Sequence, residues 1–215
     1  MRSILFAAVV LALGGCATTE GVTSFKAAGD TEKLHEKERR LWHEAAGYDN
    51  TIERSGQIYE HARATRYLQG VMDGLYPEFK GKIPVRIYDS TQLNAFAMPG
   101  GYIYVTRGIL AHMNSEAQLA GVLGHEIAHV TSRHSASQLT QQQLYGLGLG
   151  VASIFSKTVA KYGDPAQQGL SLLFLKYSRD DEREADDLAV KYAAAAGYDP
   201  REIPATYVML ERLGE

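Results

Sequence analysis

The segment from residue 115 to 133 most constrains the fold, because it places ionisable residues inside a strongly apolar helix. Ser115 with Gln118 three residues later is typical of a helix start and predicts a helix from Glu116 to about Arg133. The apolar flanks of this segment are Leu119, Val122, Leu123, Ile127 and Val130. Such a helix is expected to be central and buried. Burying its two histidines and its inner glutamate costs free energy unless a metal or a partner group satisfies them.

These ionisable residues form an HExxH pattern that can hold a metal ion. The pattern consists of His125, Glu126 and His129. A spacing of four residues puts both imidazoles on one helix face, so that two ring nitrogens can reach the same Zn²⁺. Glu126 lies one residue further round, where it can take a proton from bound water without being a ligand. The pattern also arises by chance, so a metal site requires a third ligand.

A second acidic helix offers that ligand. Ser178, followed by acidic residues, predicts a helix start, and Gly197 predicts its end. Within this helix Glu182 and Asp186 are four residues apart, so one can bind the metal while the other accepts the N–H of a ligating histidine. Glu184 is the competing ligand, but it lies about 200° round the helix from Glu182. We prefer Glu182 as the third ligand, because of the two glutamates it alone has an acid, Asp186, four residues downstream, with Ala185 between them. The alternative for this acidic stretch is a charged, solvent-exposed helix face.

The remaining chain is predicted to be mostly helical with one small sheet. Apolar periodicity from residue 31 to 76 predicts two helices, with a break at residues 47–50. Three short runs with a two-residue period follow at 84–88, 95–98 and 102–105, and Pro99-Gly100-Gly101 supplies a turn between the last two. We therefore expect an α+β fold with a three-stranded antiparallel sheet beside the HExxH helix. Asp199 before Pro200 predicts one further helix start.

The first fifteen residues have the features of a secretory signal peptide. Arg2 gives a basic start, and the apolar run at residues 4–13 is about half the ~20 residues that span a bilayer. Leu13-Gly14-Gly15-Cys16 resembles the bacterial lipobox, which implies that Cys16 is lipidated and becomes the mature N-terminus. Ala17 in the next position, rather than Asp, favours the outer membrane by the same resemblance. The alternative is an ordinary signal peptide with a chance cysteine. Residues 16–29 then form the lipidated cysteine and a flexible tether.

Composition excludes several classes of protein. The length of 215 residues fits one ordinary domain, and 45% hydrophobic with 22% charged residues argues against disorder. A net charge of −3 without a basic stripe argues against a nucleic-acid partner. Because Cys16 is the only cysteine, any metal must be held by imidazole and carboxylate groups. The glycines at 146, 148 and 150 are not a GxGxxG loop after a predicted strand, so we expect no nucleotide partner.

Three separated motifs together resemble a known family. The HExxH pattern and Glu182-Arg183-Glu184-Ala185-Asp186, preceded by Tyr177-Ser178-Arg179, are similar to the gluzincin zinc metallopeptidases related to HtpX and the CAAX prenyl proteases. Residues 94–108, from Asn94 to Gly108, resemble the strand segment that precedes the zinc helix in that family. The resemblance runs from about residue 58 to 213. The lipobox and the lack of a long apolar span point to the periplasmic lipoprotein branch.

The resemblance implies a zincin-like metallopeptidase domain over residues 30–215. One Zn²⁺ per chain would be bound by His125, His129 and Glu182, with Glu126 as the general base and Asp186 orienting His125. The candidates for stabilising the oxyanion are Tyr177, Arg179 and Tyr192. The strand formed by Asn94, Ala95, Phe96 and Ala97 would bind an extended substrate through backbone hydrogen bonds, although its apolar content equally suits a core strand. His134, five residues past His129, lies off the ligand face, which favours a structural or surface role.

The function that the resemblance implies is hydrolysis of peptide bonds in misfolded or unassembled envelope proteins. The protein would be periplasmic and lipid-anchored, in the outer membrane of a Gram-negative bacterium, with unfolded proteins as its substrates. The alternative is a zinc-stabilised chaperone or assembly factor of the outer membrane with little proteolysis. Glu126 favours the enzyme, because a structural zinc site has no need of a general base beside an open coordination position.

Overall fold

A computed structural model describes residues 36–135, 137, 177–206 and 208 of the chain. The predicted signal peptide, the lipidation site Cys16, the tether and the glycines at 146–150 lie outside the described residues. Among the helices of the described part, none combines the length and the apolar content that crossing a membrane requires.

The elements are mostly helical and follow one another in a simple order. They are α1 (Glu36–Arg54), α2 (Ala62–Leu75), the 3₁₀ helix η2 (Pro77–Phe79), β1 (Val85–Tyr88), β2 (Ala95–Ala97), β3 (Ile103–Thr106), α3 (Arg107–His112), α4 (Glu116–Thr131) and α8 (Arg179–Ala195). A short helical segment at 202–206 follows α8. The predicted α+β class with a predominance of helix is confirmed.

The sheet is mixed rather than antiparallel, which corrects the predicted arrangement. Its strand order is β1-β3-β2, with β3 parallel to β1 and antiparallel to β2. The error came from assuming that strands consecutive in sequence pair with each other. Every residue of β3 is buried, which suits the central position, whereas the three-residue β2 lies at an edge. The predicted turn between β2 and β3 is confirmed, with positive φ angles of 85° at Gly100 and 93° at Gly101.

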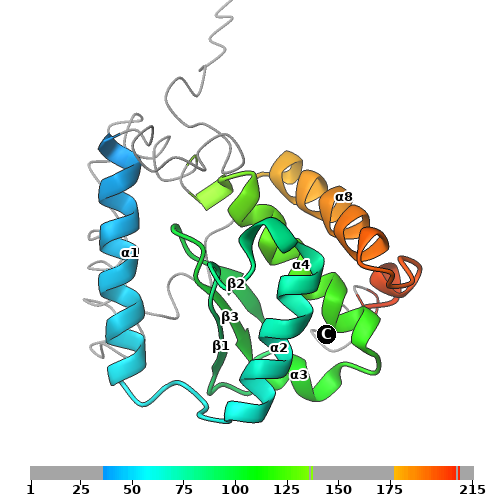
Figure 1. The fold of residues 1–215 in the computed structure, drawn as a ribbon, viewed down its shortest axis with the longest axis horizontal. Coiled ribbons are helices and arrows are strands. Elements are labelled where there is room, and N and C mark those ends of the chain that lie inside the picture. Colours follow the sequence, from blue (N-terminus) through cyan, green and yellow to red (C-terminus); the bar gives the residue numbers. More distant parts are fainter. Residues whose placement is uncertain (1–35, 136, 138–176, 207, 209–215) are drawn as a thin grey trace, which may run out of the picture.

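The sheet lies between two helical layers, as Figure 1 shows, with α1 on one side and α2 with α4 on the other. Alternation along the strands produces this arrangement. Val85, Ile87 and Val105 join the apolar core that α2 and α4 complete. On the opposite face, the aromatic rings of Phe96 and Tyr104 stack with centroids 4.8 Å apart. Helix α8 packs on α4, on the side away from α1.

Helix α1 runs through residues 47–50, where the sequence predicted a break. The reason is a buried polar contact with the sheet. Asp49, which is 4% exposed, accepts two hydrogen bonds from the Arg86 guanidinium, each 2.7 Å long. The hydroxyl of Tyr104 donates a third, at 2.5 Å. Such contacts to an ionised side chain outweigh the cost of about 1 kcal/mol for a glycine inside a helix.

The helix pair α4 and α8 is well specified by the sequence. Ser115 caps α4 by accepting from the Gln118 N–H, which confirms the predicted start, although the helix ends at Thr131 rather than Arg133. Ser178 and Asp181 form a reciprocal capping box at the start of α8. The face of α8 that contacts α4 is made of small residues, all of them fully buried: Ala185, Ala189 and Ala193. Gly124 on α4 allows the close approach, since a Cβ there would lie 3.3 Å from the Ala189 Cα.

Candidate metal centre

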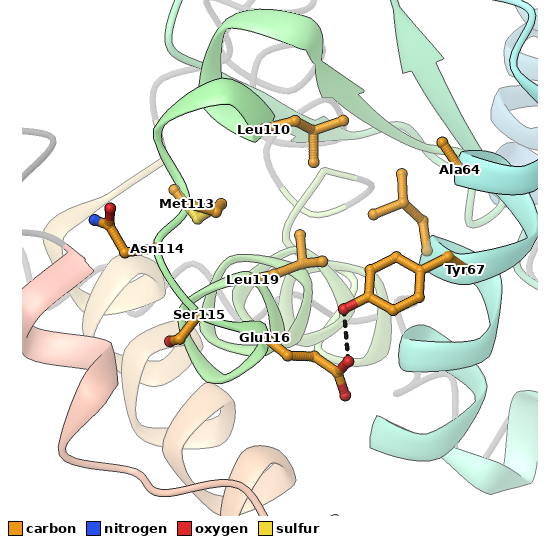
Figure 2. Close-up of a pocket in the computed structure, with 9 residues that line it drawn as sticks. Ala64, Tyr67, Leu110, Met113, Asn114, Ser115, Glu116 and Leu119 are labelled. Carbon is orange, nitrogen blue, oxygen red and sulfur yellow. Dashed lines mark hydrogen bonds between the residues drawn. The ribbon is translucent and has the colours of Figure 1, made fainter.

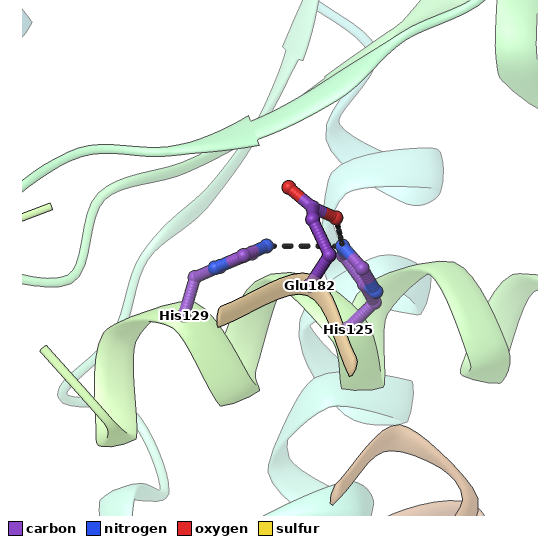
Figure 3. Close-up of side chains that lie close together, drawn as sticks. All are labelled: His125, His129 and Glu182. Atoms are coloured by element: carbon purple, nitrogen blue, oxygen red, sulfur yellow. Dashed lines mark hydrogen bonds and ion pairs between the residues drawn. The ribbon is translucent and has the colours of Figure 1, made fainter. Parts of the chain in front are cut away.

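Helices α4 and α8 bring three potential metal ligands together (Figure 3). His125 and His129 project from adjacent turns of α4, and Glu182 faces them from the first turn of α8. The two Nε2 atoms are 3.0 Å apart, and Glu182 Oε2 lies 3.4 Å from His125 Nε2. One donor atom from each residue lies within 4.8 Å of the others. Two ring nitrogens and one carboxylate oxygen therefore point at a common position.

Acidic side chains make this position favourable for a cation. Asp186, one turn after Glu182, places Oδ1 3.0 Å from Nδ1 of His125. Desolvation alone would lower the pKa of His125, but hydrogen bonds to Asp186 and Glu182 raise it to about 10. A positive charge is thus stabilised at His125, although the side chain of His125 is only 16% exposed.

Glu126 lies beside the three donors and is 7% exposed. Burial raises the pKa of its carboxyl to about 7, and Glu182 acts in the same direction. His125 and a hydrogen bond from the backbone N–H of Ala97 partly oppose the rise. The contact with Ala97 ties this carboxylate to the edge strand β2, on the side of α4 that faces the sheet.

Side chains from the end of α4 and the start of α8 enclose His129. Its ring stacks on Tyr177, with centroids 3.9 Å apart, and its Nδ1 lies 2.9 Å from Nδ1 of His134. Glu184, the competing ligand of the sequence analysis, instead bonds Ser132 Oγ at 2.9 Å and lies 3.4 Å from His134 Nε2. His134 is 4% exposed, so it is not a surface residue.

The three oxyanion candidates occupy different surroundings. The Tyr177 hydroxyl pairs with Ser135 Oγ at 2.6 Å, and the Tyr192 hydroxyl pairs with Thr131 Oγ1 at 3.0 Å. Either tyrosine would have to exchange that bond before donating to a reacting oxygen. Arg179 is exposed at the first position of α8.

The predicted substrate edge borders a cavity that reaches the metal centre. The cavity has a volume of about 150 Å³ and is lined by Leu93, Asn94, Ala95, Ile109, Val122, His125 and Glu126. In the sheet, the Thr106 N–H donates to Asn94 and the Met98 N–H donates to Tyr102. Since backbone groups alternate in direction along a strand, those of Ala95 and Ala97 point to the outer edge. This outer edge therefore faces Glu126.

A second cavity lies between α2, α3 and the start of α4 (Figure 2). Its volume is about 400 Å³, and its apolar lining includes Leu68, Leu110, Met113 and Leu119. At its rim Glu116 accepts hydrogen bonds from Tyr67 at 2.5 Å and from Tyr198 at 2.7 Å. Glu116 precedes His125 by nine residues, or about 13 Å along the helix. This cavity is thus separate from the metal centre.

Comparison with known families agrees with the geometry. Residues 62–207, which include every residue of the metal centre, match peptidase family M48. The chain belongs to peptidase family M48. It thus contains a domain of a metallopeptidase family, and the predicted relationship to HtpX-like metallopeptidases is confirmed.

Relatives of this M48 domain come from bacteria and mitochondria. The chain is 35% identical over 133 residues to the mitochondrial metalloendopeptidase OMA1 of Arabidopsis thaliana, covering 60% of this chain and 26% of that protein. It is 30% identical over 139 residues to the beta-barrel assembly-enhancing protease of Escherichia coli K12, covering 59% and 27%. The metalloprotease YcaL of the same strain is 30% identical over 135 residues, covering 60% and 51%. The matched regions thus span between a quarter and a half of these relatives.

Proposed function

We propose that this chain is a zinc-dependent metalloendopeptidase that hydrolyses peptide bonds in misfolded or unassembled envelope proteins. The observation that carries the proposal is the convergence of His125, His129 and Glu182 beside the buried carboxyl of Glu126. Membership of an M48 family of metallopeptidases supports it.

The donor set suits zinc. Two imidazole nitrogens and one carboxylate oxygen are a known ligand set of catalytic zinc sites, which keep a fourth position open. When bound there, zinc would provide Lewis-acid chemistry: polarisation of a carbonyl and a lowered pKa of water, so that hydroxide is available as a nucleophile at neutral pH. Asp186 would fix His125 with its Nδ1 protonated, so that Nε2 presents a lone pair to the ion.

Glu126 is placed to move the proton. Its carboxylate would accept a proton from the attacking water and return it to the leaving amine. Burial raises the pKa of this carboxyl to about 7 without a metal, and a bound cation would lower it, which favours the ionised form that a general base requires. The Ala97 N–H holds one side of the carboxylate and thereby fixes its direction.

The outer edge of β2 would bind the substrate as an added strand. Ala95 directs its backbone groups outward, next to the cavity that His125 and Glu126 line. An extended chain paired with Ala95 would lie across the metal centre, and recognition through the backbone tolerates many sequences. This suits unfolded proteins as a class of substrate.

The envelope location rests on the sequence and on the relatives. The lipobox-like segment ending at Cys16 supports lipid anchoring, and Ala17 supports the outer membrane. Relatives named beta-barrel assembly-enhancing protease support an envelope role. Labelled palmitate should be incorporated into the wild-type chain in bacteria but not into Cys16→Ser; equal labelling of both would exclude Cys16 as the anchor.

Cleavage of casein, an unfolded protein, tests the enzymatic proposal. The full-length chain, purified in detergent and loaded with zinc, should cleave casein. Glu126→Gln should bind the same amount of zinc and lose at least about a hundredfold in rate, since general-base catalysis contributes about that much or more. If neither protein cleaves while both hold one zinc, the peptidase proposal fails, and the chaperone alternative is supported instead.

A further inference from the structure

We propose that His134 is a positioning residue that fixes the ring of the metal ligand His129. This inference rests on the proposed function only in that it concerns the same metal site. Its basis is a buried contact between the Nδ1 atoms of the two rings, 2.9 Å apart.

The backbone after α4 is shaped so that His134 returns to the site. The helix ends at Thr131 with Ser132 as its cap, and Arg133 then adopts a φ of 61°. Among the described residues, Arg133 alone has a positive φ without being glycine. Such a conformation costs on the order of 1 kcal/mol or more and persists only where surrounding contacts require it. Here it turns the chain back, so that His134 lies against a ligand five residues earlier.

The hydrogen-bonding pattern has a single consistent arrangement for a metal-binding His129. Its Nε2 faces the ligand group, 3.0 Å from His125 Nε2, so a bound metal takes that lone pair. Nδ1 of His129 then carries the proton and donates to Nδ1 of His134. The proton of His134 is consequently on Nε2, which lies 3.4 Å from Glu184 Oε2 and 3.6 Å from Asp181 Oδ1.

The same arrangement argues that His134 is not itself a ligand. Its Nδ1 meets His129 on the side of that ring opposite to the Nε2 that faces His125. Its Nε2 faces the acids of the first turn of α8. Ser132 Oγ holds Glu184 at 2.9 Å, and Glu184 in turn faces His134. Each ligating histidine therefore has its own support: Asp186 for His125, and the pair His134 and Glu184 for His129.

Metal affinity is the direct test, because a merely structural histidine would not alter it. The full-length chain is purified in detergent, stripped of metal and titrated with Zn²⁺ against a chromophoric chelator. His134→Ala should raise the zinc dissociation constant about 10- to 100-fold, as loss of a residue that orients a ligand does. His134→Gln should recover much of the affinity, because its amide oxygen can accept from His129 and its NH₂ can donate to Glu184.

Two further measurements separate positioning from stability. Co²⁺ bound to His134→Ala should show a visible absorption spectrum shifted from that of the wild type, because a reoriented imidazole changes the ligand field. His112→Ala is the matched control: Nδ1 of His112 bonds the Gly108 carbonyl at 2.8 Å on α3, and its zinc affinity should equal the wild type's. If His134→Ala fails to fold, Glu184→Gln carries the test and is expected to lose several-fold in zinc affinity.

Wild-type zinc affinity together with an unchanged Co²⁺ spectrum in His134→Ala would overturn the proposal. Where His134→Ala does not fold, unchanged zinc affinity and an unchanged Co²⁺ spectrum in Glu184→Gln would overturn it. A wild-type chain that binds zinc but cleaves nothing would contradict the proposed peptidase function. The positioning role of His134 would then still be decided by the measured zinc affinities. A wild-type chain that binds no divalent metal would overturn both.

Discussion

The Nδ1 atom of His125 lies 3.0 Å from Oδ1 of Asp186, across the contact between α4 and α8. Glu182, one turn earlier on α8, faces the other nitrogen of the same ring. The position of α8 thus determines both where Glu182 lies and how the His125 ring is oriented. The packing of the two helices therefore determines the geometry of the three candidate ligands.

Asp186→Ala is expected to weaken zinc binding about 10- to 100-fold, because His125 loses the acceptor that fixes its tautomer. The Asp186 side chain is 49% exposed, so the free energy of unfolding of the metal-free protein should change by less than about 1 kcal/mol. Chelator competition and urea unfolding measure the two effects. Asp187→Ala, at the exposed neighbouring position, is the control and should bind zinc normally. Equal affinities in both variants would exclude the orienting role.

Ala95→Pro should lower kcat/KM for unfolded substrates by at least about tenfold while zinc affinity is kept. Proline removes the N–H that faces outward from β2, and proline is tolerated on an edge strand where that N–H makes no ladder bond. Ala95→Ser retains the N–H and should remain close to wild type. Kinetics on casein together with zinc titration would measure this. A proline variant as active as the serine variant would show that substrates do not pair with β2.

Gly124→Val should destabilise the protein by about 1–3 kcal/mol and weaken zinc binding as well. Even a bare Cβ at Gly124 would lie 3.3 Å from Ala189 Cα and 3.4 Å from its carbonyl oxygen, so α8 must move away from α4. That movement displaces Glu182. Gly70→Val is the matched control on α2, where a Cβ meets nothing within 4 Å, and a change within about 0.5 kcal/mol is expected. Loss of stability without loss of zinc affinity would contradict the coupling.

The sequence was most informative where local signals and chemistry agreed. Ser115 and Ser178 predicted both helix starts, because each cap is formed within four residues. Spacings of four within helices placed His125 with His129 and Glu182 with Asp186 on shared faces, and the structure brings these faces together. The two faces could be paired although they are far apart in sequence, because a metal site requires three donors at one point.

Non-local contacts limited the prediction elsewhere. The break expected at 47–50 was wrong because Asp49 contacts Arg86 and Tyr104, neither of which is near it in sequence. The prediction of an antiparallel sheet was wrong because the fully buried β3 lies between β1 and β2 and runs parallel to β1. The contact between His134 and His129 depends on the positive φ of Arg133. An arginine in the sequence does not indicate a positive φ, whereas a glycine can.

Stability should fall as the pH rises above about 10, partly because of Tyr104. This side chain is 0% exposed; burial and the hydrogen bond to Asp49 raise its pKa well above the ordinary 10. Its contribution is complete below pH 10, where the phenol is protonated in both states. It is lost as the pH rises from 10 towards the folded pKa, because only the unfolded state then ionises, at about 1.4 kcal/mol per pH unit.

Urea unfolding of the wild type and Tyr104→Phe at pH 8 and pH 11 measures this contribution. The phenylalanine variant should be less stable at pH 8, since the buried carboxylate of Asp49 loses one hydrogen bond, but it should lose about 1 kcal/mol less than the wild type between the two pH values. Other buried tyrosines whose pKa is raised, such as Tyr177, contribute equally to both proteins and cancel in the difference. Parallel losses in the two proteins would show that Tyr104 titrates alike in the folded and unfolded states, and hence that its phenol is not held protonated against Asp49.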